Sequence, residues 1–160
     1  ERYDNILIPE HTYISIPFTA EKLNLKWNWN KNYQWRDYYY LGNTNIIDAA
    51  FLWEKNSYIS ETYMCISFQF RKHLSLGRGG IILLDNKDAY DTLKKMVYDG
   101  RSSDKPWSEQ NIDMIGYHYY MTPETAQLGL DKLQMAIDTP PRQWVVTDWP
   151  DLTEMQVFKK

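Results

Sequence analysis

Residues 79–85 read Gly-Gly-Ile-Ile-Leu-Leu-Asp, and residues 88–98 read Asp-Ala-Tyr-Asp-Thr-Leu-Lys-Lys-Met-Val-Tyr. The first segment is a short apolar run between glycines and a carboxylate, which is typical of a buried strand. In the second segment, apolar residues recur with helical spacing at Ala89, Leu93, Met96 and Val97. Together the two segments predict a strand followed by a helix.

The same alternation extends over most of the chain. Short apolar or alternating runs predict further strands at residues 5–9, 23–29, 38–40, 45–48 and 63–68. One helix is expected to begin near Pro17, and another at Thr122-Pro123, where Thr122 is a natural N-cap. Strands that alternate with helices indicate an α/β fold, with a mostly parallel sheet and flanking helices.

The composition excludes several classes of protein. A chain of 160 residues is long enough for one domain with a sizeable core. The net charge of −3 argues against general nucleic-acid binding, and the sequence has no apolar run of the roughly 18 residues that a membrane helix needs. Residues 1–4 do not resemble a secretory signal, and the single cysteine cannot form an internal disulfide, so we expect a cytoplasmic protein.

Aromatic residues are abundant, with 7 Trp, 13 Tyr and 5 Phe. Such side chains bury large areas and favour strands and interfaces. The simpler interpretation is a well-filled core or an oligomer interface, and the alternative is an aromatic carbohydrate-binding surface.

Polar residues stand at the ends of the predicted strands. Asp48 ends one apolar strand, where packing gives no reason for a carboxylate. Ser67 ends another, and Lys72 follows it in a loop that closes with the glycine-rich turn at residues 77–80. In open α/β sheets ligands gather at the carboxyl ends of strands, so Asp48, Ser67 and Lys72 are candidate site residues.

Histidine does not suggest a metal site. His11, His73 and His118 lack metal-ligand spacing, and no cysteine is paired with them. We therefore expect no zinc centre.

Four segments resemble a known family in order and spacing. They are Pro9–Tyr13, Asp48-Ala49-Ala50, the Cys65–Gly80 region with Ser67-Phe68, Lys72 and Gly77-Arg78-Gly79-Gly80, and Gly116–Met121 with the helix after it. They are similar to the DegT-type (DegT/DnrJ/EryC/StrS) sugar aminotransferases, which are pyridoxal-phosphate (PLP) enzymes of aspartate-aminotransferase fold type I. The similarity extends over about residues 5–133, and it implies the central part of that family's large domain.

The resemblance assigns a role to each candidate residue. It implies that Lys72 is the Schiff-base lysine, that Asp48 pairs with the pyridine nitrogen, and that Ser67 donates to the cofactor phosphate. Thr12 and Tyr13 belong to the cofactor-binding segment, where Tyr13 would stack on the pyridine ring. His118 stands where the family has an asparagine that reaches the phosphate from a partner subunit, which implies a homodimer.

The implied function is transfer of an amino group from an amino-acid donor, usually glutamate, to a keto-sugar carried on a nucleotide. Arg71 and Arg78 could bind such an anionic substrate, or could be solvated surface charges. The alternatives are a non-catalytic remnant that serves as a dimerising domain, and a carbohydrate-binding module.

The chain also differs from the family pattern. Phe51 stands where the family has glutamine or histidine, and Tyr120 where it has arginine. The family's phosphate loop would precede Glu1, so we expect the chain to be truncated at its N-terminal side and to hold PLP weakly or not at all. Residues 1–139 are expected to form the incomplete large domain, and residues 140–160 an irregular tail.

Overall fold

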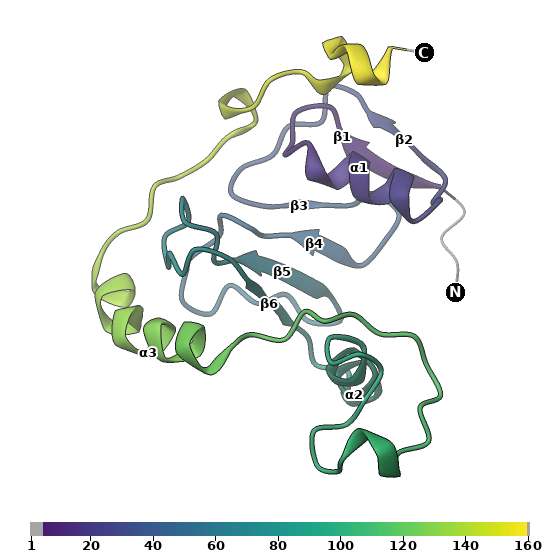
Figure 1. Ribbon diagram of the computed structural model, residues 1–160. Helices are drawn as coiled ribbons and strands as arrows, with labels where there is room; N and C mark the ends of the chain where they lie inside the picture. The colour runs from purple at the N-terminus through teal and green to yellow at the C-terminus, as the bar shows by residue number, and fades with distance from the viewer. Residues whose placement is uncertain (1–4, 160) are drawn as a thin grey trace.

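Four short strands form the central sheet of the computed structural model, which describes residues 5–159 (Figure 1). The strands lie in the order β3–β4–β5–β6. Their bounds are Tyr39–Tyr40 for β3, Ile46–Asp48 for β4, Tyr63–Ser67 for β5 and Gly80–Leu83 for β6. The buried side chains Ile47, Ala49, Leu52 and Met64 form the core beneath them. Residues 1–4, on which the expectation of no secretory signal depends, lie outside the described part.

The central sheet is mixed, which corrects the expectation of a mostly parallel sheet. β4 and β5 run parallel, but β3 is antiparallel to β4 and β6 is antiparallel to β5. A short turn joins β3 to β4, so the chain reverses there. The connection from β5 to β6 contains no helix and pairs with itself, since Phe68 N donates to Gly79 O at 2.8 Å and Phe70 N to Gly77 O at 3.1 Å. Such a hairpin brings the chain back antiparallel.

A second, two-stranded sheet precedes the central one. β1 (Ile6–Pro9) and β2 (Trp27–Asn30) run parallel, and α1 (Ser15–Lys22) connects them. Pro17 lies in the first turn of α1, as predicted from its missing N–H. The predicted strand at residues 23–29 begins only at Trp27, because Leu23 still caps α1 and Asn24 has a left-handed backbone.

The two longer helices begin at side-chain caps. Asn86 caps α2 (Lys87–Met96) by accepting the Ala89 N–H at 2.9 Å. Thr122 caps α3 (Pro123–Asp138) by accepting the Thr125 N–H at 3.3 Å, which confirms the helix start predicted from Thr122-Pro123. Between them lies the short turn η1 (Trp107–Glu109). α3 packs through Ala136 against Leu74 and Leu76 of the β5–β6 connection.

The tail after α3 returns to the first sheet (Figure 1). Up to residue 159, where the described part of the chain ends, its regular elements are the short 3₁₀ turns η2 (Val146–Asp148), η3 (Leu152–Glu154) and η4 (Gln156–Phe158). Leu152 is nevertheless 1% exposed, and its N–H donates to Glu10 O at 2.9 Å. The Phe158 ring contacts the Trp29 ring at 5.1 Å. The tail is therefore irregular in conformation but packed against the β1–α1–β2 unit.

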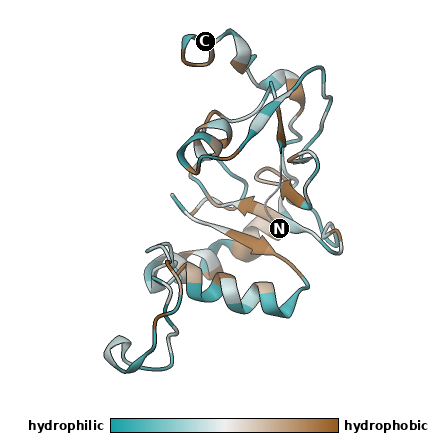
Figure 2. Ribbon diagram, turned by 90° about the vertical axis from the view of Figure 1, so that its right-hand side faces the viewer, coloured by the Kyte–Doolittle hydropathy of each residue, from teal (hydrophilic) through white to brown (hydrophobic). Residues whose placement is uncertain are grey.

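Hydropathy follows this arrangement. Figure 2 shows the strongest hydrophobic colouring on strands. β6 is hydrophobic but largely exposed, with Ile81 at 44% and Ile82 at 40%, because it is the edge strand; this corrects the expectation of a buried strand there. α2 has no buried residue, in keeping with its charged sequence. No helix within residues 5–159 has both the length and the apolar composition required to cross a bilayer.

Candidate functional site

Asp48 occupies the last position of β4, and both of its carboxylate oxygens accept hydrogen bonds. Oδ2 accepts from the Tyr39 hydroxyl at 2.6 Å, and Oδ1 accepts from the Ala50 N–H at 3.0 Å. Tyr39 stands directly opposite Asp48 in the β3–β4 register. The carboxylate is therefore fixed in one orientation at the end of the strand.

Thr12 extends this contact to the first sheet. Its hydroxyl bonds to that of Tyr39, and both residues are buried, at 2% and 3% exposure. Because the Tyr39 hydroxyl donates to Asp48, the Thr12 hydroxyl is the donor to Tyr39. The pKa of Tyr39 is raised well above its ordinary value, by burial first and then by the Asp48 charge. Tyr39 consequently remains a neutral donor, and Thr12, Tyr39 and Asp48 form a chain of hydrogen bonds.

Lys72 lies in the connection between β5 and β6. Its backbone N–H donates to Gln69 O at 2.8 Å, and its ammonium Nζ lies 3.0 Å from the centroid of the Phe51 ring. Partial burial lowers the pKa of Lys72 to about 8, while the Asp48 charge acts in the opposite direction. Phe51 follows Asp48 by only three residues, so its contact with Nζ brings the Lys72 amine near the end of β4, where the carboxylate lies.

Glycines shape the turn beyond Lys72. Gly77 and Gly79 have φ angles of +88° and +101°, which L side chains rarely adopt. These conformations let the connection close as a hairpin, with the Ser75 hydroxyl donating to Phe70 O at 2.8 Å. The glycine-rich turn thus fixes the backbone that carries Lys72.

Ser67 and Tyr13 complete the predicted set on this side of the molecule. The Ser67 hydroxyl, at the end of β5, accepts the Gln69 N–H at 3.3 Å. Tyr13 follows Thr12, is 56% exposed, and places its ring 6.0 Å from the Trp149 ring, edge to face. Both side chains leave surface open to a ligand.

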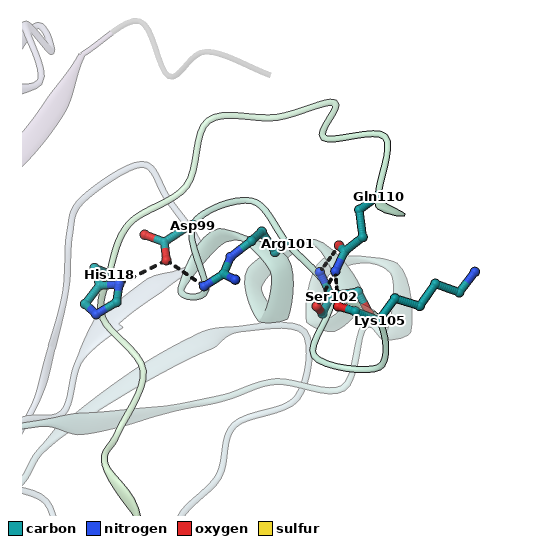
Figure 3. Close-up of polar contacts among 6 residues, drawn as sticks. All are labelled: Asp99, Arg101, Ser102, Lys105, Gln110 and His118. Carbon is teal, nitrogen blue, oxygen red and sulfur yellow. Dashed lines mark hydrogen bonds and ion pairs between the residues drawn. The ribbon is translucent and has the colours of Figure 1, made fainter. Parts of the chain in front are cut away.

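His118 lies in a different place, next to the loop after α2 (Figure 3). Its Nδ1 is 2.9 Å from Asp99 Oδ2, and the Arg101 guanidinium is 3.2 Å from the same oxygen. The hydrogen bond from His118 is the main reason that the pKa of Asp99 is lowered. No contact between His118 and Lys72 or Asp48 occurs among the described residues, so within one chain His118 is separate from the other predicted residues.

Aromatic residues that the sequence analysis did not assign to the site lie beside Lys72. Phe51 contacts the Trp144 ring at 4.4 Å and the Trp149 ring at 5.3 Å. We call these three residues the aromatic wall. Phe51 could have been noticed from the sequence, because it departs from the family pattern directly after Asp48-Ala49-Ala50. No sequence signal connects Phe51 with a tail about a hundred residues away.

Metal chemistry has no visible basis in residues 5–159, where no group of three or more His, Cys, Asp or Glu side chains could hold an ion. A hollow of about 400 Å³ lined by residues such as Asn45, Thr62 and Asp85 lies by the opposite ends of β4 and β5. It does not include Lys72 or Asp48.

The family model of the DegT/DnrJ/EryC1/StrS aminotransferases matches residues 57–142, more than half of the chain. The chain belongs to this family. The matched residues include Ser67, Lys72 and His118, whereas Thr12, Tyr13 and Asp48 precede them. The family identified from the sequence is thereby confirmed.

A solved structure shares the fold. It is that of a protein assigned as a PLP-dependent aminotransferase from Bacillus cereus ATCC 10987, with a TM-score of 0.68 and 16% sequence identity. The match covers 86% of this chain and 48% of that one, so the chain spans about half the length of its structural relative. This likeness confirms the α/β fold. A search of curated proteins finds no match.

The hydrogen-bond chain from Thr12 to Asp48 has a measurable consequence. Tyr39→Phe removes the shared hydroxyl and leaves the buried Thr12 hydroxyl without its partner. We expect the free energy of unfolding to fall by about 1–3 kcal/mol in urea denaturation at pH 7. Adding Thr12→Val should recover part of the loss, because no buried hydroxyl then remains. Tyr119→Phe, at a ring that is 74% exposed, is the control; an equal loss there would refute a specific role for Tyr39.

Proposed function

We propose that this chain is the central part of a PLP-dependent transaminase that moves an amino group from an amino-acid donor to a nucleotide-linked keto-sugar. The observation that carries the proposal is the contact of the Lys72 amine with Phe51, three residues beyond the Asp48 carboxylate that two hydrogen bonds fix at the end of β4. An amine with a lowered pKa and a fixed carboxylate are what amino transfer with PLP requires.

The residues present fit PLP. With a pKa of about 8, roughly one Lys72 amine in ten is neutral at pH 7, far more than for an ordinary lysine. Asp48 offers a carboxylate whose orientation is fixed by two donors. The Trp149 indole Nε1 is buried and has no hydrogen-bond partner among the described residues, so it is a donor available to a ligand.

Each side chain has a defined task in this proposal. PLP, when bound, supplies an electron sink for the substrate carbon that loses its proton. Lys72 would hold the cofactor covalently and, once released, would carry the proton between the substrate carbon and the cofactor carbon that share the amino nitrogen. Asp48 would keep the pyridine nitrogen protonated by its charge, Ser67 would donate its hydroxyl to the phosphate, and the exposed ring of Tyr13 would stack on the pyridine.

The substrate class is inferred from the family resemblance and from charge. Arg71 and Arg78 are both exposed, and they lie on the two strands of the Lys72 hairpin, each next to the Phe70–Gly77 pair. One guanidinium group can donate two parallel hydrogen bonds to the oxygens of one phosphate. Arg71 and Arg78 therefore suit the diphosphate of a nucleotide-linked sugar. Glutamate as the amino donor rests on the resemblance alone.

The assembly follows from the position of His118. We propose a homodimer in which His118 of one subunit reaches the cofactor phosphate of the other. His118 is exposed, and the exposed rings of Tyr117 and Tyr119 flank it, a composition common at interfaces. Sedimentation equilibrium at micromolar concentration should give the mass of a dimer, and Tyr119→Asp should lower it toward that of a monomer. A monomeric wild-type chain would refute the homodimer.

Covalent labelling tests the proposed function. Incubation with excess PLP followed by borohydride should fix the cofactor on Lys72, because its amine is more often neutral than those of exposed lysines. Peptide mapping by mass spectrometry identifies the labelled residue. Lys72→Ala should abolish the main label, whereas Lys55→Ala, at an exposed lysine, should leave it in place.

A second labelling result would contradict the proposed function. A label spread evenly over surface lysines, unchanged by Lys72→Ala, would contradict the transaminase assignment. It would support a remnant that keeps the family fold without its cofactor chemistry.

A further inference from the structure

The Lys72 amine rests on an aromatic face rather than in a shell of polar groups. Its Nζ is 3.0 Å from the centroid of Phe51, well within the distance at which a cation is attracted to a ring. Phe51 comes three residues after Asp48, just beyond the strand end that carries the carboxylate. The same short segment therefore supplies both groups that attract the ammonium.

The tail holds Phe51 from behind. Trp144 and Trp149 both pack on its ring, with centroids 4.4 and 5.3 Å away. Trp144 is fixed in turn, since its N–H donates to Asp37 Oδ1 at 2.7 Å and its carbonyl accepts the Asp37 N–H at 2.8 Å. The Trp149 carbonyl is 2.9 Å from Nδ1 of His11. Phe51 is therefore clamped between the Lys72 amine and an anchored tail.

Three influences act on the amine. Partial burial disfavours the ammonium, while the Asp48 charge and the Phe51 ring favour it. On the tail side, the Arg142 guanidinium lies 3.9 Å from the centroid of Trp144 and pairs with the Asp148 carboxylate at 2.6 Å. The ring of Phe51 is thus the element that both locates the amine and offsets its loss of water.

We propose that Phe51, supported by Trp144 and Trp149, is the positioning residue that fixes the Lys72 amine and sets its reactivity. The role of that amine in amino transfer rests on the proposed function. The contact between Phe51 and Lys72 does not depend on that function. The aromatic wall thereby makes the tail a part of the Lys72 site.

Trace acetylation with acetic anhydride, followed by peptide mapping across a pH series, measures the pKa of Lys72 in the unloaded chain. Phe51→Leu removes the ring and keeps an apolar side chain, so the ammonium loses an attraction while remaining partly buried. We expect the pKa to fall by about half a unit to one unit, and labelling of Lys72 at pH 7 to rise about three- to fivefold, as the neutral fraction of the amine rises. Phe51→Tyr, which keeps the aromatic face, should leave both near the wild-type values.

Controls separate this effect from general loosening. Lys55 serves as an internal standard, and its labelling should be the same in every variant. Trp107→Leu removes an aromatic ring that is 67% exposed and outside the aromatic wall, and it should leave the pKa of Lys72 unchanged. If Phe51→Leu does not fold, Phe51→Met removes the ring with less change in volume and carries the same expectation. A Lys72 pKa that stays at the wild-type value, or rises, in the folded variant would overturn the proposal.

The two proposals fail separately. If PLP labels Lys72 but Phe51→Leu does not lower its pKa, the positioning role is wrong and the transaminase proposal stands. If the pKa falls as expected but PLP does not label Lys72, the positioning role stands and the transaminase proposal is wrong.

Discussion

The chain of hydrogen bonds from Thr12 through Tyr39 to Asp48 connects the two sheets of this protein. Thr12 belongs to the segment after β1, and Tyr39 and Asp48 belong to neighbouring strands of the central sheet. Each group is buried or partly buried, so losing any one of them leaves another without its partner. This constraint fixes the orientation of the Asp48 carboxylate, and it holds the segment with Tyr13 near the end of β4.

Opposing effects set the pKa of the Lys72 amine. A hairpin closed by two left-handed glycines carries the amine into a partly buried position, which lowers its pKa. The Asp48 charge and the Phe51 ring keep the ammonium from becoming prohibitively unstable. The balance leaves a neutral fraction large enough for chemistry at physiological pH. In the proposed transaminase, this neutral fraction is what allows Lys72 to react.

Local patterns carried much of the structure. The Thr122 cap, the apolar strands and the strand-end position of Asp48 depend on neighbours in sequence, and all could be predicted. The mixed sheet could not, because the direction of β6 depends on the β5–β6 connection pairing with itself through Phe68 and Gly79. The hydrogen bond between Tyr39 and Asp48 results from the register of β3 against β4, which places the two residues opposite each other. The predicted strand at residues 38–40 could have suggested this contact. The contacts of Phe51 with Trp144 and Trp149 join distant segments without any periodic pattern, so they required the structure.

The proposed site requires that Asp48 and Lys72 face one space, and the pKa of Lys72 in Asp48→Asn tests this most directly. The substitution keeps the shape of the side chain and removes its charge, so the ammonium of Lys72 loses a favourable interaction. We therefore expect the pKa of Lys72 to fall below its value of about 8. Asp113→Asn changes the net charge equally at an exposed position and should leave that pKa unchanged. A Lys72 pKa that is the same in Asp48→Asn as in the wild type would contradict a shared site.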